Sequence, residues 1–191
     1  MNIDERIIFA LWVVFVAYWA MSAPSAKRNI DGRRQLWRRI AVRLGIIMVI
    51  LFAGRVPIVI SVIRTAAVRV PGSTLTHMAG IALCAVGIAL AIYARTILGR
   101  NWGMPMSRKE NPELVTGGPY AVIRHPIYTG MLCAMLGTAL STNIVWIVVM
   151  IPFGLYFIYS ARREEKLMIN EFPDQYPVYM KRTRMLLPFV L

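Results

Sequence analysis

The chain has 191 residues, of which 58% are hydrophobic, and it carries a formal net charge of +13. An average soluble domain is only about half apolar, so this composition excludes an ordinary soluble domain, and the length favours one compact unit. The positive charge stands beside apolar segments, where membrane topology and anionic lipids account for it, and we expect no nucleic-acid partner.

Five apolar segments predict five membrane helices, at residues 7–23, 40–63, 75–98, 127–140 and 144–159. A bilayer core needs about 20 helical residues, and the first three segments supply them. The last two have only about 14 to 16 residues each, so we expect a tight helical hairpin around Ser141, Thr142 and Asn143. A re-entrant pair that does not cross the membrane is the alternative. The sequence therefore predicts an all-α polytopic membrane protein with a C-terminal helical hairpin.

Basic residues set the expected orientation of these helices. They concentrate in residues 27–39, 95–124 and 162–184, whereas the opposite side receives only Arg6, Arg55, Arg64 and Arg69. Positive residues favour the cytoplasmic side of a membrane. We therefore expect an integral protein of a prokaryotic inner or plasma membrane, with its amino terminus outside and its carboxyl terminus in the cytoplasm.

Two polar segments, residues 101–128 and 162–188, contain ionisable and aromatic side chains at the expected cytoplasmic mouth. The predicted hairpin ties the two segments together. A site built from both could take a water-soluble cofactor from the cytoplasm and an apolar substrate from the lipid. The two cysteines, Cys84 and Cys133, lie inside apolar segments and are expected to pack as small hydrophobic residues, and no Cys/His spacing predicts a metal.

The start of the fourth predicted helix has the chemistry of an anion site. Gly117 and Gly118 predict a turn, and Pro126 suits the first position of a helix. His125 then stands at the N-cap, where backbone N–H groups and the helix dipole favour a carboxylate. The alternative is that Arg124, His125 and the nearby Tyr residues are only interfacial anchors.

Glu164 and Glu165 follow the fifth apolar segment directly. Two acidic side chains at the C-terminal end of a helix oppose its dipole, but the cost disappears if the helix continues through Met168. Their neighbours are basic, so solvated ion pairs that contribute little to stability are an alternative to a binding role.

These residues resemble the signature of a known family. Residues 116–120 read Thr-Gly-Gly-Pro-Tyr, residues 124–130 read Arg-His-Pro-Ile-Tyr-Thr-Gly, and residues 164–165 read Glu-Glu. The pattern continues through Leu167, Phe172, Tyr176, Tyr179 and the Leu-Pro pair at 187–188. In order and spacing it resembles the isoprenylcysteine carboxyl methyltransferases and the related phospholipid methyltransferases, over somewhat less than half of the chain.

The resemblance implies a cytoplasmic site for S-adenosylmethionine, with S-adenosylhomocysteine as product, in a single membrane domain over residues 1–191. Residues 1–98 would supply three spans and residues 99–191 the catalytic region. Carried over by position, the cofactor contacts fall on Pro112, Glu113, Leu114, Val115, Tyr120, His125, Pro126, Ile127, Tyr128 and Glu164.

The same resemblance implies a lipophilic methyl acceptor. A basic residue usually precedes the first glutamate by one helical turn, and this chain has Ser160 there. We expect Arg124 to act in catalysis by holding the acceptor. Arg162, Arg163 and Glu165 are the further candidates for acceptor binding.

Four functions remain open at this level. O-methylation of an isoprenoid-type or other lipid carboxylate comes first, and N-methylation of an aminophospholipid head group is the alternative. A nicotinamide-dependent membrane reductase with a related helical tail is the third, and a non-catalytic membrane protein is the fourth. No glycine-rich loop follows a strand, which excludes a soluble Rossmann-type methyltransferase.

Overall fold

The computed structural model describes residues 2–22, 73–102, 113–143 and 145–186. Four long helices form the bundle: α1 (Ile3–Ser22), α4 (Thr74–Leu98), α5 (Pro126–Ser141) and α6 (Val145–Glu171). Shorter elements are the 3-10 turns η2 (Gly99–Asn101) and η3 (Gly118–Ala121), and the helix α7 (Tyr176–Arg182). The described residues contain no strand beyond one isolated bridge between Ile123 and Arg184, so the all-α prediction is confirmed.

The predicted first and third spans correspond to α1 and α4, and the predicted second span (residues 40–63) lies outside the described residues. The chain begins α1 earlier than hydropathy alone predicts, because Asn2 and Glu5 cap it reciprocally. Ser73 caps α4 by accepting a hydrogen bond from the Thr76 amide.

The helix of the last span extends beyond its apolar segment, which confirms the alternative in which it continues through Met168. Hydropathy ends at residue 159, but α6 continues for 27 residues to Glu171 with Glu164 and Glu165 in its interior. Charged residues do not end a helix, and the next strong breaker is Pro173. Three described helical segments are therefore long and apolar enough to cross a membrane, namely Ile3–Ser22, Thr74–Asn101 and Val145–Glu171, whereas α5 is shorter.

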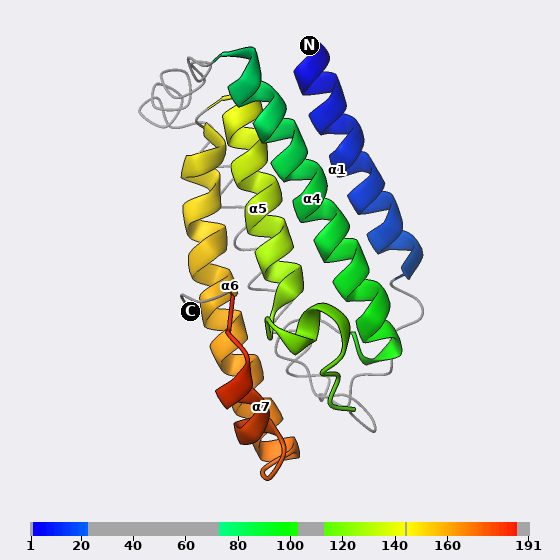
Figure 1. The fold of residues 1–191 in the computed structure, drawn as a ribbon, viewed down its shortest axis with the longest axis vertical. Helices are drawn as coiled ribbons and strands as arrows, with labels where there is room; N and C mark the ends of the chain where they lie inside the picture. Colours follow the sequence, from blue (N-terminus) through cyan, green and yellow to red (C-terminus); the bar gives the residue numbers. More distant parts are fainter. Residues whose placement is uncertain (1, 23–72, 103–112, 144, 187–191) are drawn as a thin grey trace, which may run out of the picture.

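The four long helices lie side by side (Figure 1), and α1 and α4 run in the same direction. At one end of the bundle, His77 Nδ1 lies 3.2 Å from Asp4 Oδ2. At the other end, Arg95 Nη2 donates to the Ser22 carbonyl at 2.6 Å. Ser22 and Ser73 consequently stand at opposite ends of the bundle.

Helices α4 and α5 approach each other through glycines. A Cβ on Gly87 would lie 2.5 Å from the Gly130 carbonyl oxygen, and a Cβ on Gly137 would lie 2.4 Å from the Cys84 amide nitrogen. Without glycine at these positions the two backbones could not come so close, and such contacts are a common basis of helix packing in membranes. This interface fixes the start of α5 relative to α4.

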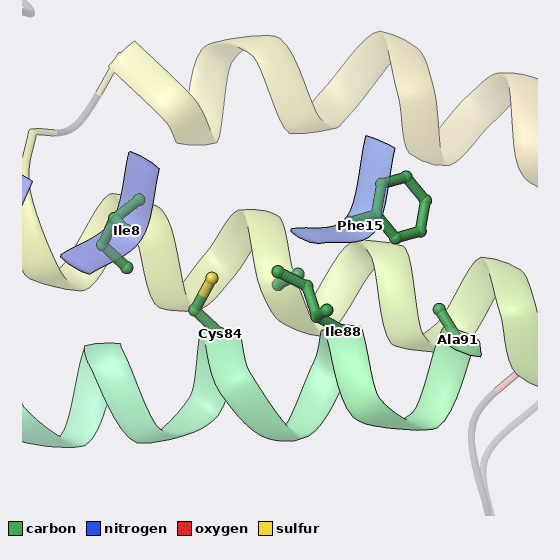
Figure 2. Close-up of a cluster of buried hydrophobic side chains, with 6 residues drawn as sticks. Ile8, Phe15, Cys84, Ile88 and Ala91 are labelled. Atoms are coloured by element: carbon green, nitrogen blue, oxygen red, sulfur yellow. The ribbon is translucent and has the colours of Figure 1, made fainter. Parts of the chain in front are cut away.

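The buried core joins α1 to this pair. Figure 2 shows Ile8 and Phe15 of α1 packed over Cys84, Ile88 and Ala91 of α4. Trp12 Nε1 also donates to Thr138 Oγ1 of α5 at 3.0 Å. A polar contact inside an apolar bundle fixes the rotation of α1 about its own axis, since only one face of α1 can place Trp12 there.

Candidate active site

The site forms at the end of the bundle where α5 begins (Figure 1). Gly118 has φ +60°, which favours glycine and turns the chain into η3. Pro126 is the first residue of α5, and His125 is its N-cap with φ −124° and ψ 60°. Both predicted positions are confirmed. The His125 side chain makes no capping hydrogen bond, so its ring is available for contacts with α6.

The segment after α7 returns to the start of α5. The Arg124 amide donates to the Arg184 carbonyl at 2.7 Å, and the His125 amide donates to the Met185 carbonyl at 3.1 Å. In the opposite direction, the Arg184 amide donates to the Val122 carbonyl at 3.0 Å. Thr129 Oγ1 donates to the Leu186 carbonyl. Residues 183–186 are therefore part of the site.

Arg124 holds three parts of the chain together. Its Nε lies 2.6 Å from Glu165 Oε1 on α6, and its Nη1 donates to the Thr183 carbonyl at 2.6 Å and to the Met180 carbonyl at 3.3 Å. The side chains of Arg124 and Glu165 are each only 10% exposed. The hydrogen bonds described for Arg124 use its Nε and Nη1 atoms.

His125 lies between the two glutamates. Its Nδ1 is 3.5 Å from Glu164 Oε2, and its Nε2 is 3.5 Å from Glu165 Oε1. Burial alone would lower the pKa of His125, but the two neighbouring carboxylates outweigh it and raise the pKa above its ordinary value. The imidazole is thus favoured in its charged form beside two acidic groups.

Tyr128 connects the ring of His125 with α6. Its ring stacks on His125 with centroids 5.6 Å apart and on Phe157 with centroids 4.7 Å apart. Its hydroxyl donates to Glu164 Oε1 at 2.6 Å. Glu164 therefore receives a hydrogen bond from α5 while its side chain stays 27% exposed.

Tyr120 is buried beneath the site. Its hydroxyl donates to the Ala94 carbonyl of α4 at 3.4 Å, and its own carbonyl accepts a 2.6 Å hydrogen bond from Tyr179 of α7. Burial raises the pKa of Tyr120 and raises that of Tyr179 to about 12. Both hydroxyls therefore stay neutral donors at ordinary pH, and Tyr120 positions η3 between α4 and α7.

Two buried polar atoms near the cluster make no hydrogen bond of good geometry within the described residues: His125 Nε2, which lies 3.5 Å from Glu165 Oε1, and Ser160 Oγ. Ser160 stands on α6 one helical turn before Glu164 and is fully buried. Buried polar groups are normally paired. The charged imidazole of His125 beside the partly exposed carboxylate of Glu164 fits the two opposite charges of a small zwitterion such as an amino acid.

The remaining predicted site residues are spread more widely. Pro112 lies outside the described residues. Glu113 is exposed and accepts a hydrogen bond from Asn101 at 3.1 Å, and Leu114 and Val115 are partly buried. Arg162 and Arg163 are exposed on α6, on a different face from buried Ser160 and Glu165. The structure thus brings together His125, Tyr128, Glu164, Arg124 and Glu165.

Sequence reasoning missed Thr183, Arg184 and Met185. They act through backbone groups, which leave no trace in residue type. Their role becomes visible only in the folded chain, where the segment after α7 pairs with the segment before α5.

Comparisons with known proteins match this chain to a family and to several relatives. A family model described as phospholipid methyltransferase matches residues 75–175. The chain is 30% identical to the cobalt-zinc-cadmium resistance protein CzcN of Cupriavidus metallidurans, over 54% of this chain and 46% of the relative. It is also 30% identical to the protein-S-isoprenylcysteine O-methyltransferase of Schizosaccharomyces pombe, over 56% of this chain and 47% of the relative.

The fold has a solved counterpart. The structure of a eukaryotic intramembrane Ras methyltransferase, an isoprenylcysteine carboxyl methyltransferase, aligns with a TM-score of 0.55 at 20% identity, covering 84% of this chain and 55% of the other. That likeness shows the membrane fold. The chain spans about half the length of the curated relatives it matches.

Proposed function

The chain belongs to the phospholipid methyltransferase family, and from this premise we propose that it transfers a methyl group from S-adenosylmethionine to a lipophilic acceptor. The observation that carries the proposal is the cluster of His125, Tyr128 and Glu164 where α5 meets α6. The cluster combines a helix start, a buried imidazole and a partly exposed carboxylate, which suit the two charged ends of an amino acid.

Each end of the cofactor has a protein counterpart. Pro126 has no N–H group, and the amides of Ile127 and Tyr128 in the first turn of α5 have no partner within the helix. These amides and a protonated His125 favour a carboxylate. The Glu164 carboxylate favours an ammonium group. When bound, S-adenosylmethionine supplies an electrophilic methyl group on a sulfonium.

The remaining predicted cofactor contacts complete the proposal. Leu114 and Val115 are partly buried and suit the adenosine, while Tyr120 holds η3 in place beneath the site. The chain contributes by fixing the geometry of the reactants, which supplies about 7–11 kcal/mol of the barrier when the alignment is ideal.

We propose that the acceptor is an isoprenoid-type or other lipid carboxylate. The two curated relatives described above carry different names. The one named as a protein-S-isoprenylcysteine O-methyltransferase favours O-methylation. A carboxylate needs no general base, whereas an amine acceptor must lose a proton. N-methylation of an aminophospholipid would require a proton acceptor such as Glu164 or neutral His125.

The surface of α6 is compatible with an acceptor that arrives from the lipid. The helix exposes large apolar or aromatic side chains, namely Phe153, Leu155 and Tyr156. Phe157 contacts the rings of Phe153 and Tyr156 on one side and stacks on Tyr128. We propose that the head group is met by Arg124 through Nη2, and that Arg162 and Arg163 draw it to the membrane mouth.

We also propose that the site end of the bundle faces the cytoplasm and that the amino terminus lies outside. Arg95, Arg100 and Arg124 stand at the site end, while Asp4 and Glu5 stand at the other. Parallel α1 and α4 are compatible with an odd number of crossings between them, as the five-span prediction requires.

Binding and transfer can be tested separately. Calorimetry in detergent with S-adenosylmethionine, S-adenosylhomocysteine and NADPH should give heat for the first two only. Heat from NADPH alone would favour the reductase, and no heat from any of the three would favour a non-catalytic protein. Labelled-methyl transfer into a total lipid extract should then label an acidic lipid as a base-labile ester. A base-stable label on an aminophospholipid would establish N-methylation.

A further inference from the structure

We infer that the buried pair of Arg124 Nε and Glu165 has a positioning role, apart from the proposed contact of Arg124 Nη2 with the acceptor: the pair fastens residues 183–186 to the start of α5 and holds His125 in place for the cofactor. This inference rests on the proposed function, because it concerns the same site. It assigns different tasks to two adjacent glutamates. Glu164 faces the cofactor, and Glu165 acts through its neighbours.

The first observation is the burial of the Arg124–Glu165 pair. The two side chains are joined at 2.6 Å, and each is 10% exposed. A buried charge that loses its partner is strongly unfavourable, because the low-dielectric interior cannot solvate it. The pair therefore resists separation, and it ties the residue before the α5 N-cap to the C-terminal half of α6.

The second observation is that Arg124 also binds the chain around α7. Nη1 donates to the carbonyls of Thr183 and Met180, at 2.6 Å and 3.3 Å. These carbonyls belong to the last turn of α7 and the residue after it, where a cation is favoured by the helix dipole. One guanidinium thus joins α5, α6 and α7.

The third observation is the backbone pairing that follows. Ile123 and Arg184 form a parallel bridge, and the His125 amide donates to the Met185 carbonyl at 3.1 Å. Residues 183–186 can leave only if these hydrogen bonds break together with the contacts of Arg124. The backbone of His125 is therefore fixed from the C-terminal side.

The fourth observation separates the two glutamates. Glu165 Oε1 is shared between Arg124 Nε and His125 Nε2, and its side chain is 10% exposed. Glu164 contacts His125 Nδ1 and Tyr128, and its side chain is 27% exposed. Glu165 thus orients the imidazole from the buried side, and Glu164 is the carboxylate with a surface to offer a ligand.

The test uses the full-length protein in detergent and S-adenosylhomocysteine as the probe. Arg124→Gln and Glu165→Gln should each weaken binding by roughly tenfold or more, because each removes a charge-assisted contact. Hydrogen exchange at the amides of Arg124, His125 and Arg184 should accelerate in both variants, while exchange within α4 stays as in the wild type. Arg124→Lys keeps the positive charge but lacks the several N–H donors of the guanidinium, so its loss of affinity should be intermediate.

Arg182→Gln is the matched control, because it also removes an arginine, but from an exposed position on α7 outside residues 183–186. This variant should bind and exchange like the wild type. If Arg124→Gln does not fold, Arg124→Lys and Glu165→Gln carry the test.

Three results would overturn the inference. Fast hydrogen exchange with a normal affinity for S-adenosylhomocysteine would mean that Arg124 and Glu165 have only a structural role. Reduced affinity with normal exchange would mean that Arg124 or Glu165 touches the ligand directly. Normal values in both measurements would deny any role. Failure of the wild type to bind S-adenosylhomocysteine would instead contradict the proposed function. The hydrogen-exchange data would still test whether Arg124 and Glu165 hold residues 183–186 against the start of α5.

Discussion

Tyr128 donates its hydroxyl hydrogen to Glu164 across 2.6 Å, and the two residues belong to different helices, α5 and α6. The contact brings the two sequence motifs together, since one contains Tyr128 and the other Glu164. The geometry of this contact depends on the helix packing behind it and on the charge state of His125 beside it.

Changing Glu164 to Gln should weaken the binding of S-adenosylhomocysteine by about 1.5–3 kcal/mol, the usual contribution of a hydrogen bond to a charged group. The amide keeps the size of the side chain and can still accept from Tyr128, so the protein should fold, with a modest loss of thermal stability because the charged contact with His125 is lost. Calorimetry and a thermal melt measure the two effects. Asp174→Asn, which removes an exposed acid just after α6, should leave both unchanged. Equal affinities of Glu164→Gln and the wild type would count against a cofactor role for Glu164.

The stability that His125 provides should depend on pH. Its pKa is raised in the folded protein above the ordinary value of 6.5, so the folded state binds the proton more tightly than the unfolded chain. The stabilisation is then complete below about pH 6.5 and is lost as the pH rises through the raised folded-state value. Thermal melts of the wild type and His125→Gln between pH 6 and 9 should converge as the pH increases. A difference between the two proteins that grows with pH would contradict the assigned sign.

The glycines between α4 and α5 provide a test of the fold. Gly137→Ala would place a Cβ 2.4 Å from the Cys84 amide nitrogen, so the helices must move apart at a cost of about 1–3 kcal/mol. A lower melting temperature in detergent is the expected result. Gly154→Ala is the matched control, because its Cβ would meet only Leu132 Cδ2 at 3.7 Å. Alanine favours the helix more than glycine does, so this control should be neutral or slightly stabilising. Equal melting temperatures for the two variants would contradict the close approach of α4 and α5.

The proposed orientation can be read by cysteine labelling from either side of the membrane, once Cys84 and Cys133 have been replaced. Asn170 and Thr74 are both exposed, near opposite ends of the bundle. A cysteine at position 170 should react only with a reagent that enters the cytoplasm, and one at position 74 should react from outside. The reverse pattern would invert the topology and remove the cytoplasmic route for the cofactor.

Local rules were enough to locate the start of α5. Pro126 suits the first position of a helix wherever the rest of the chain lies, and His125 before it follows from that alone. The end of α6 did not follow from hydropathy, because an apolar segment marks where lipid contact stops and says little about where a helix stops; the alternative of a helix that continues through Met168 is the one the structure confirms. Glu164 and Glu165 consequently belong to the interior of a helix and to two different faces.

The contacts of Arg124 could not be predicted from its neighbours in sequence. Its partners Glu165 and Thr183 are 41 and 59 residues away. Two of the four groups that accept its hydrogen bonds are the backbone carbonyls of Met180 and Thr183, which every residue possesses. The approach of α4 to α5 does have a sequence signal. Gly80 and Gly87 on α4, like Gly130 and Gly137 on α5, are seven residues apart and therefore lie on one face of each helix.

The return of residues 183–186 to the start of α5 has a consequence for biosynthesis. The ribosome releases these residues after α1, α4, α5 and α6, so the helices can enter the membrane and pack before the cluster around His125 is complete. We expect translation products that stop before residue 183 to be inserted and helical yet inactive. We therefore expect activity to appear only after residues 183–186 have been made, and a chain that stops earlier could occupy the membrane without using cofactor.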